Sequence, residues 1–138
     1  MAAIIGGNIG KMIFNVLSTD STLISLIGSA NKIQPIVVYN ETPAEGVFYE
    51  VLNVENVNTK TTSTADLVVV VYQIECFSKS YITLINISER IQYILDKLSG
   101  GTYGGYKIQS NIYLDTSEDY NSKNSLYYRQ LTFQCRAI

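Results

Sequence analysis

The residues that could carry catalysis or bind a metal are few and scattered along this chain. None of its 138 residues is a histidine, and its two cysteines, Cys76 and Cys135, lack the CxxC spacing of metal and redox sites. Histidine is the side chain that most often serves as general base and as nitrogen ligand. Both cysteines fall on faces that we predict to be buried, so we interpret them as small core residues. They could lie close together if their strands are neighbours.

The acidic residues and the glycines also fail to form a recognisable site. Glu50 and Glu55 are an odd number of positions apart in a predicted strand, which places them on opposite faces. Glu118 and Asp119 fall in a polar stretch, where solvation explains them. The glycines between Gly100 and Gly105 follow a helix and precede a strand, which reverses the order of a phosphate-binding loop. We therefore expect no catalytic residue, no metal site and no cofactor.

The composition disfavours a nucleic-acid reader and a membrane protein. The formal net charge is −2, and the ten lysines and arginines are scattered singly. No apolar run approaches the ~20 residues that a membrane span needs, and the first residues lack the charged region of a signal peptide. Charged residues make up only 16% of the chain. The surface must therefore be covered by uncharged polar groups or partly buried in an oligomer.

The strongest pattern runs from Val68 to Leu98. Val68 to Phe77 is a run of β-branched and aromatic residues that is typical of a central strand, and Ser78-Lys79-Ser80 is a tight junction after it. Hydrophobic residues then recur at helical spacing, at Tyr81, Leu84, Ile87, Ile91, Ile94, Leu95 and Leu98. We expect Gly100-Gly101 to end this helix. Its apolar stripe should pack Leu84, Ile91 and Leu95 over Val70, Ile74 and Cys76.

The flanking segments predict two short helices and four further strands. The helices are expected over Asn8–Ser18 and Thr22–Ile27, the second with an N-cap within Ser18–Ser21 and a left-handed C-cap at Gly28. The strands are expected over Lys32–Tyr39, Val47–Asn56, Tyr106–Asp115 and Leu126–Ala137. Pro35 places the first of these at an edge or a strand start. The polar stretches Asn58–Asp66 and Thr116–Ser125 are interpreted as a hairpin tip and a turn.

This order of elements predicts a single α+β domain over residues 1–138. It should have two layers, with an N-terminal helix and one long helix packed on a mainly antiparallel or mixed sheet of about five strands.

Three segments of the chain form a pattern found in a known family. In chain order they are VLSTDSTLISLIGSANKIQP, FYEVL and VYQIECFSKSYITLINISERIQYILDKL. The best match is Tyr72 to Tyr81, where a strand runs through the junction into an amphipathic helix. Between about Leu17 and Leu98 the chain resembles the small tail-completion, or tail-terminator, proteins of long-tailed bacteriophages. One departure is Pro43, which lies several residues before Phe48, whereas the family's proline precedes its second strand more closely.

The resemblance implies a structural virion protein, assembled in the host cytoplasm, and no enzyme. It implies a homohexameric ring at the head-proximal end of the tail, bound to the last ring of the tail tube protein. Such a ring stops tube polymerisation, presents a surface to neck or connector proteins, and leaves a lumen through which DNA passes without sequence-specific binding. Two alternatives stay open: a head–tail adaptor, neck or other minor tail protein with the same fold, and a small-molecule enzyme. The weakness of the enzyme alternative is that the sequence shows no cluster of titratable residues.

Two sets of residues are the candidates for contacts with other subunits or partners. The first set lies in the predicted hairpin tip and turn, and comprises Thr59, Lys60, Thr61, Thr62, Ser63, Thr64, Asp119 and Tyr120. The second set, Val69, Val71 and Phe77, points to the face of the central strand that helices on one side of the sheet cannot cover. We predict that a neighbouring subunit supplies part of that cover.

Overall fold

The structure is a computed structural model, and it describes residues 5–35, 44–57, 67–96, 98, 101–103 and 106–137. In chain order its elements are α1 (Ile5–Ser18), α2 (Ser21–Ile27), a 3-10 turn (Ala30–Lys32), β1 (Ile33–Pro35), β2 (Glu45–Val57), β3 (Leu67–Ser78), α3 (Tyr81–Leu95), β4 (Thr102–Tyr103), β5 (Tyr106–Asn121) and β6 (Leu126–Ala137). None of the helices described is long and apolar enough to cross a membrane.

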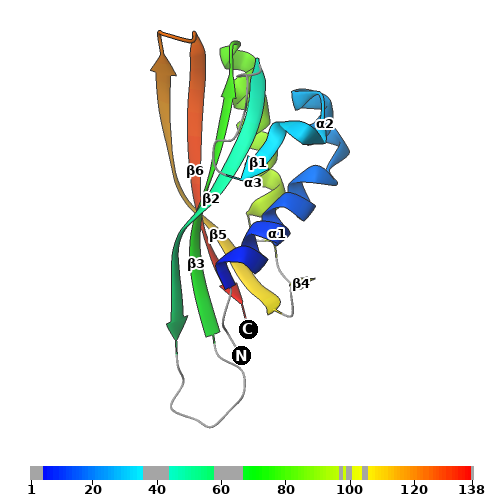
Figure 1. The fold of residues 1–138 in the computed structure, drawn as a ribbon, viewed down its shortest axis with the longest axis vertical. Helices are drawn as coiled ribbons and strands as arrows, with labels where there is room; N and C mark the ends of the chain where they lie inside the picture. The colour runs from blue at the N-terminus through cyan, green and yellow to red at the C-terminus, as the bar shows by residue number, and fades with distance from the viewer. Residues whose placement is uncertain are drawn as a thin grey trace.

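The strands form one mixed sheet with the order β1-β2-β3-β6-β5-β4. β1 is parallel to β2, and every other neighbouring pair is antiparallel. The three helices gather on one side of this sheet, as Figure 1 shows. Because helices cover one face of a mixed sheet, the fold is the expected two-layer α+β arrangement.

The core lies between the helices and the inward face of the sheet. The side chains of β3 alternate strictly: Val68, Val70, Tyr72, Ile74 and Cys76 are fully buried. They belong to one cluster with Leu84, Ile91 and Leu95 of α3, as the sequence predicted. Each fully buried Leu or Ile side chain contributes about 1.5–3 kcal/mol to folding.

The start of α2 is joined to α3 by one carboxylate. Asp20 is the N-cap of α2 and accepts from the Leu23 backbone N–H at 2.9 Å. The same carboxylate accepts two hydrogen bonds from the Arg90 guanidinium, at 2.9 and 2.8 Å. At the other end of α2, Gly28 has a φ of 96°, so the predicted left-handed C-cap is confirmed.

α3 ends earlier than predicted, and no glycine ends it. Asp96 takes an extended conformation directly after Leu95. Its Oδ1 accepts from the Tyr113 backbone N–H at 3.2 Å, and the Leu95 carbonyl accepts from Asn111 Nδ2 at 2.7 Å. Polar groups of β5 therefore bond with the end of the helix, and the expected stop at Gly100-Gly101 is wrong. Tyr81 also departs from the predicted apolar stripe, because it is exposed and donates to Glu118 at 2.7 Å.

The predicted turn at Thr116–Ser125 is mostly strand. β5 continues to Asn121, and only the residues from Ser122 to Ser125 form the turn. Cross-strand pairs explain the extension, because Glu118 faces Arg129 and the rings of Tyr120 and Tyr127 lie 4.7 Å apart.

Bulges in β2 and β5 reverse several predicted side-chain directions. The register of β5 shifts between Ile108 and Ser110 and again between Tyr113 and Asp115. Each shift inserts an extra residue and turns the following side chains to the other face. Asn111 is therefore buried, whereas Ile112 and Leu114, which simple alternation from Ile108 places on the core face, are exposed.

β2 has a similar shift between Val51 and Asn53. It brings Glu50 and Glu55 to the same face, because their partners in β3 are Gln73 and Val69. The expectation of opposite faces is therefore wrong for this pair. The shift also moves Val54 away from the face of Phe48, where the alternation had placed it.

Candidate functional site

The sheet has one face that no described helix covers, and we call it the helix-free face. Cross-strand partners share a face, so the register maps it in rows across β2, β3, β6 and β5. The rows are Gly46–Phe77–Tyr128–Asp119, Phe48–Glu75–Gln130–Ser117, Glu50–Gln73–Thr132–Asp115, Asn53–Val71–Gln134–Ile112 and Glu55–Val69–Arg136–Ser110. This surface mixes valine, glutamine and acidic side chains. It is neither a typical core nor a fully polar exterior.

The structure separates the three predicted interface residues of β3. Val69 and Val71 lie on the helix-free face and are half-buried, so both can contact another protein. Phe77 is only 1% exposed in the single chain. The rings of Phe48 and Tyr128 flank it with centroids at 6.1 and 5.9 Å. Its own chain therefore supplies the cover that we expected from a neighbour, and that expectation is corrected for Phe77.

The structure describes only some of the interface residues that we predicted in the hairpin tip and the turn. Thr59, Lys60, Thr61, Thr62, Ser63 and Thr64 lie outside the described residues. Asp119 and Tyr120 are exposed residues of strand β5, not of a loop. They point to opposite faces: Asp119 shares a row with Tyr128 on the helix-free face, and Tyr120 pairs with Tyr127 on the helix side.

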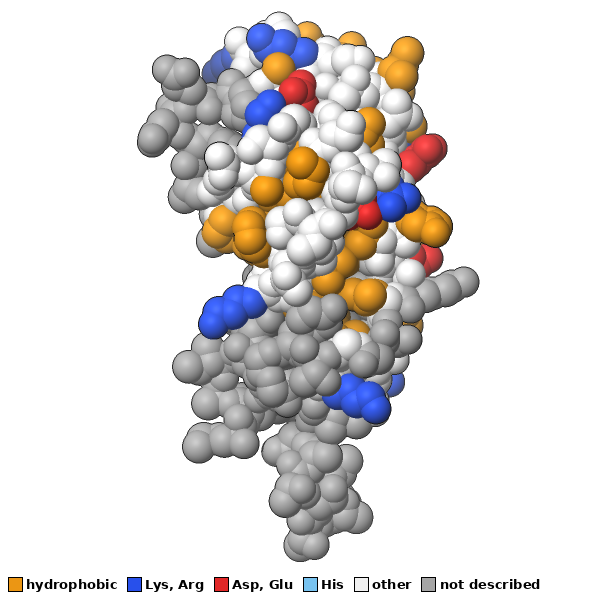
Figure 2. Space-filling view, turned by 90° about the vertical axis from the view of Figure 1, so that its right-hand side faces the viewer, with side chains coloured by type: hydrophobic (Ala, Val, Ile, Leu, Met, Phe, Trp, Pro, Cys, Tyr) orange, Lys and Arg blue, Asp and Glu red, His pale blue; other side chains and the backbone are white. Residues whose placement is uncertain are grey.

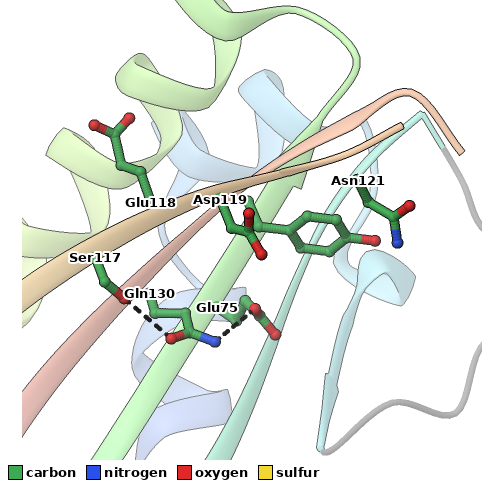
Figure 3. Close-up of a pocket in the computed structure, with 7 residues that line it drawn as sticks. Glu75, Ser117, Glu118, Asp119, Asn121 and Gln130 are labelled. Atoms are coloured by element: carbon green, nitrogen blue, oxygen red, sulfur yellow. Dashed lines mark hydrogen bonds between the residues drawn. The ribbon is translucent and has the colours of Figure 1, made fainter. Parts of the chain in front are cut away.

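A pocket of about 400 Å³ lies on the helix-free face near the β5–β6 turn. Two hydrogen bonds cross its floor: Ser117 Oγ donates to Gln130 Oε1 at 3.1 Å, and Gln130 Nε2 donates to Glu75 Oε1 at 2.8 Å. Figure 3 shows this chain of contacts across three strands, while Glu118 points away from it. Glu118, Asp119, Asn121 and Tyr128 complete the lining.

The electrostatic character of the helix-free face is acidic. Among the described residues its rows hold five carboxylates, of Glu50, Glu55, Glu75, Asp115 and Asp119, and one guanidinium, of Arg136. Burial raises the pKa of Glu75, and the charges of Glu50 and Asp119 raise it further against the opposing hydrogen bond from Gln130. The carboxylates of Glu50 and Asp119 are thus close enough to act on that of Glu75. No group of three or more candidate ligands in the described part of the chain could hold a metal ion.

The cysteines occupy core positions, as predicted. Both are fully buried, and burial raises the pKa of the Cys135 thiol to about 12 and that of Cys76 further. Cys135 pairs with Val70, which lies six positions before Cys76 on β3. Their strands are neighbours, but the two thiols are at different levels of the sheet. Neither shows the lowered pKa of a reactive thiol.

The described residues form no continuous apolar surface on the helix side of the molecule. Ile82 and Tyr93 of α3 are the most exposed large hydrophobic residues there, at 74% and 75%. Figure 2 views this side, and its hydrophobic side chains form separate groups with polar atoms between them. Single hydrophobic residues of this kind are common on protein surfaces.

Sequence reasoning missed four further exposed hydrophobic residues on the two flanking strands. Leu52 and Val54 lie on β2 and Ile112 and Leu114 on β5, and each is 39–47% exposed. Their exposure follows from the bulges, which the alternation of the sequence does not reveal. In β5 the sequence signals were Ser110, a polar residue at an apolar position of the alternation, and Tyr113, an aromatic residue at a polar one.

The fold defines the chain as a two-layer α+β domain with one open sheet face, and solved structures contain a similar one. A chain in a structure described as the virion of a native gene transfer agent (GTA) particle superposes with a TM-score of 0.74. The match covers 98% of each chain at 14% sequence identity, so it shows a shared fold. No family model matches the sequence, and no curated protein matches it.

Proposed function

We propose that this chain is a structural protein of a phage-like virion. The observation that carries the proposal is the likeness in fold to a virion chain along almost the whole of both chains. A full-length match supports a shared role more than a match to one motif does. The sequence resemblance to tail-completion proteins points in the same direction.

The specific role that we propose is that of a tail terminator. A ring of six copies, as the resemblance to the family implies, caps the head-proximal end of the tail tube and joins it to a neck protein. The helix-free face supports this role, because Val69 and Val71 are half-buried there and leave apolar surface that a neighbouring subunit can cover. The cluster of Glu50, Glu75 and Asp119 gives the same face a charge that selects among partners. In this role the chain has no catalytic task, and DNA passes through the ring lumen.

The experiment is to image particles made by a phage that lacks this chain. A terminator predicts tails of irregular and excessive length, because nothing stops tube polymerisation. Complementation with the wild-type chain should restore a uniform length. A labelled copy should appear at the head-proximal end of the tail.

The alternative adaptor role predicts a different image. If the chain joins heads to finished tails, its loss should leave tails of normal length beside unattached heads. That result would overturn the terminator role and keep the chain a virion protein.

A further inference from the structure

Two apolar patches lie on opposite lateral edges of the sheet. We define the β2 patch as Leu52 and Val54, and the β5 patch as Ile112 and Leu114. The four side chains are between 39% and 47% exposed. Large hydrophobic residues in pairs at a sheet edge are less common on a monomer than single ones, and they favour a protein contact.

The two patches lie at the same level along the strands. Asn53, between the two residues of the β2 patch, pairs with Val71 of β3. Val71 pairs with Gln134, and Gln134 pairs with Ile112 of the β5 patch. One row of the sheet therefore passes through the level of both patches, so two copies placed side by side can bring these edges together without a shift along the strands. Val54 pairs with the inward Val70 and lies on the helix side, whereas Ile112 lies on the helix-free face.

The backbone at this level is also open among the described residues. β1 reaches only as far as Tyr49 along β2, and β4 pairs only with Tyr106 and Lys107 of β5. No strand among the described residues therefore pairs with the outer edge of either strand at the patches. β2 and β5 also run in opposite directions, because both β3 and β5 are antiparallel to β6 and β2 is antiparallel to β3. Figure 1 shows their arrowheads at opposite ends of the molecule.

We propose that the β2 patch of one copy docks against the β5 patch of the next, in a head-to-tail contact. This deepens the proposed function, on which it rests, by assigning the surface that joins neighbouring subunits. Two different surfaces meet in such a contact, and repetition with a closing rotation produces a ring. The antiparallel sense of the two edges allows main-chain pairing across the contact.

Charge complementarity favours this contact on one side of the patches. Glu55 is exposed on β2, and its row runs across the sheet to Ser110 of β5. Arg136 of β6 is also exposed, and it is the neighbour of Ser110 in this row. A neighbour's Glu55 therefore approaches Arg136, which lies one strand from the edge. In the row on the other side of the patches, Glu50 of one copy would meet Asp115 of the next, which brings two carboxylates together. The contact is thus attractive at one end, apolar in the middle and repulsive at the other end.

Mixing two interface variants tests the head-to-tail geometry. Leu52→Asp disables the β2 patch and Leu114→Asp disables the β5 patch, so each variant keeps one working edge. Alone, neither should form rings in light scattering or sedimentation. Mixed in equal amounts, they should form a one-to-one heterodimer and nothing larger, because only one of the two possible contacts remains.

Matched controls separate this effect from unfolding. Ile82→Asp places the same charge at a residue that is 74% exposed on α3, and it should leave the ring intact. Circular dichroism should show native secondary structure for all three variants. A variant that fails this check is replaced by the milder Val54→Ser or Ile112→Ser.

A charge exchange gives a second, independent readout. Glu55→Arg and Arg136→Glu should each weaken association at least tenfold at low salt, and the double variant should recover most of the loss. Asp115→Lys should strengthen association, because it removes the repulsion with Glu50.

The outcomes separate this inference from the proposed function. Rings that form equally well in Leu52→Asp and Leu114→Asp would overturn the edge contact and leave a terminator possible. Rings that depend on both patches but do not limit tail length would support the contact and overturn the terminator role. A wild-type chain that stays monomeric at high concentration, also with tube protein present, would overturn both.

Discussion

At the scale of the residue, the carboxylate of Asp20 performs two structural tasks at once. It caps α2 and holds Arg90 of α3 by two hydrogen bonds. The guanidinium of Arg90 lowers the pKa of Asp20 from its usual 3.8, against an opposing effect of burial. A single side chain thus fixes the position of one helix on another.

Substitutions of Asp20 should distinguish its two tasks. Asp20→Ala removes the cap and the ion pair and should lower the free energy of unfolding by about 1–2 kcal/mol. Asp20→Asn should cost less than about 1 kcal/mol, because asparagine caps helices equally well and only the partly exposed ion pair is lost. Urea titrations followed by circular dichroism at pH 7 measure both values, and a larger loss in Asp20→Asn would contradict the assignment.

The pH dependence of the Asp20 contribution follows from the lowered pKa. Its stabilisation is fully present above pH ~4, the unfolded value, and is lost as the pH falls through the lower folded value. The difference between wild type and Asp20→Asn should therefore disappear in strong acid.

Glu75 should show the opposite pH dependence. Its pKa is raised above 4.5, chiefly by burial, so the folded state favours the protonated carboxyl. Stability is gained below the unfolded value and lost as the pH rises through the folded value. Glu75→Gln removes the buried charge and retains an oxygen that accepts from Gln130. It should therefore raise the melting temperature at pH 7 and leave it unchanged at pH 4. A lower melting temperature at pH 7 would mean that the negative charge has a stabilising partner.

At the scale of the element, β3 and α3 were predictable and β5 was not. Every inward residue of β3 is fully buried, because an uninterrupted alternation of hydrophobic residues specifies one register. In β5, two bulges insert residues that alternation cannot locate, so Asn111 turns inward and Ile112 outward. The end of α3 was missed for a related reason, since its polar partners lie on β5 and are distant in sequence.

The inward Asn111 should therefore be one of the costly residues to replace. Its Oδ1 accepts from the Tyr72 hydroxyl at 2.8 Å, and its Nδ2 donates to the Leu95 carbonyl at 2.7 Å. Burial raises the pKa of Tyr72 well above 10, so its hydroxyl stays protonated and donates. Asn111→Ala leaves two buried groups unpaired and should lower the free energy of unfolding by about 2–4 kcal/mol.

Two further variants test this hydrogen-bond chain. Tyr72→Phe should cost about 1 kcal/mol, because it leaves only the Asn111 carbonyl without a donor. The exposed neighbour Gln109 provides a control, and Gln109→Ala should change stability by less than about 0.5 kcal/mol. Equal losses in Asn111→Ala and Gln109→Ala would contradict the inward placement of Asn111.

At the scale of the whole molecule, the two faces of the sheet have different roles, because helices pack on only one of them. The helix side is closed by packing, and its exposed hydrophobic residues are dispersed. The helix-free face has five carboxylates and half-buried valines, and the β2 and β5 patches lie at the lateral edges of the sheet. Assembly through the edges would leave the acidic centre of that face available to a second protein. An assembly protein needs both kinds of surface, one for its own copies and one for a partner.

Val71 tests whether this division of duties holds, because it lies in the row that joins the two patches. It is half-buried on the helix-free face, whereas its neighbour Val70 is fully buried against the helices. Val71→Asp should therefore disrupt rings, measured by sedimentation, while the melting temperature of the monomer falls only slightly. Val70→Asp should unfold the chain, since it places a charge in the core.

The effect of Val71→Asp can also be tested in the virion. If the chain is the proposed tail terminator, a phage with Val71→Asp should make folded protein and over-long tails, because a terminator that cannot assemble cannot cap the tube. If Val71→Asp loses both the ring and the folded monomer, the helix-free face is ordinary core. Normal tail length with rings absent would show that capping does not require the ring. The results therefore show whether Val71 serves the packing of a single chain or the contact between copies.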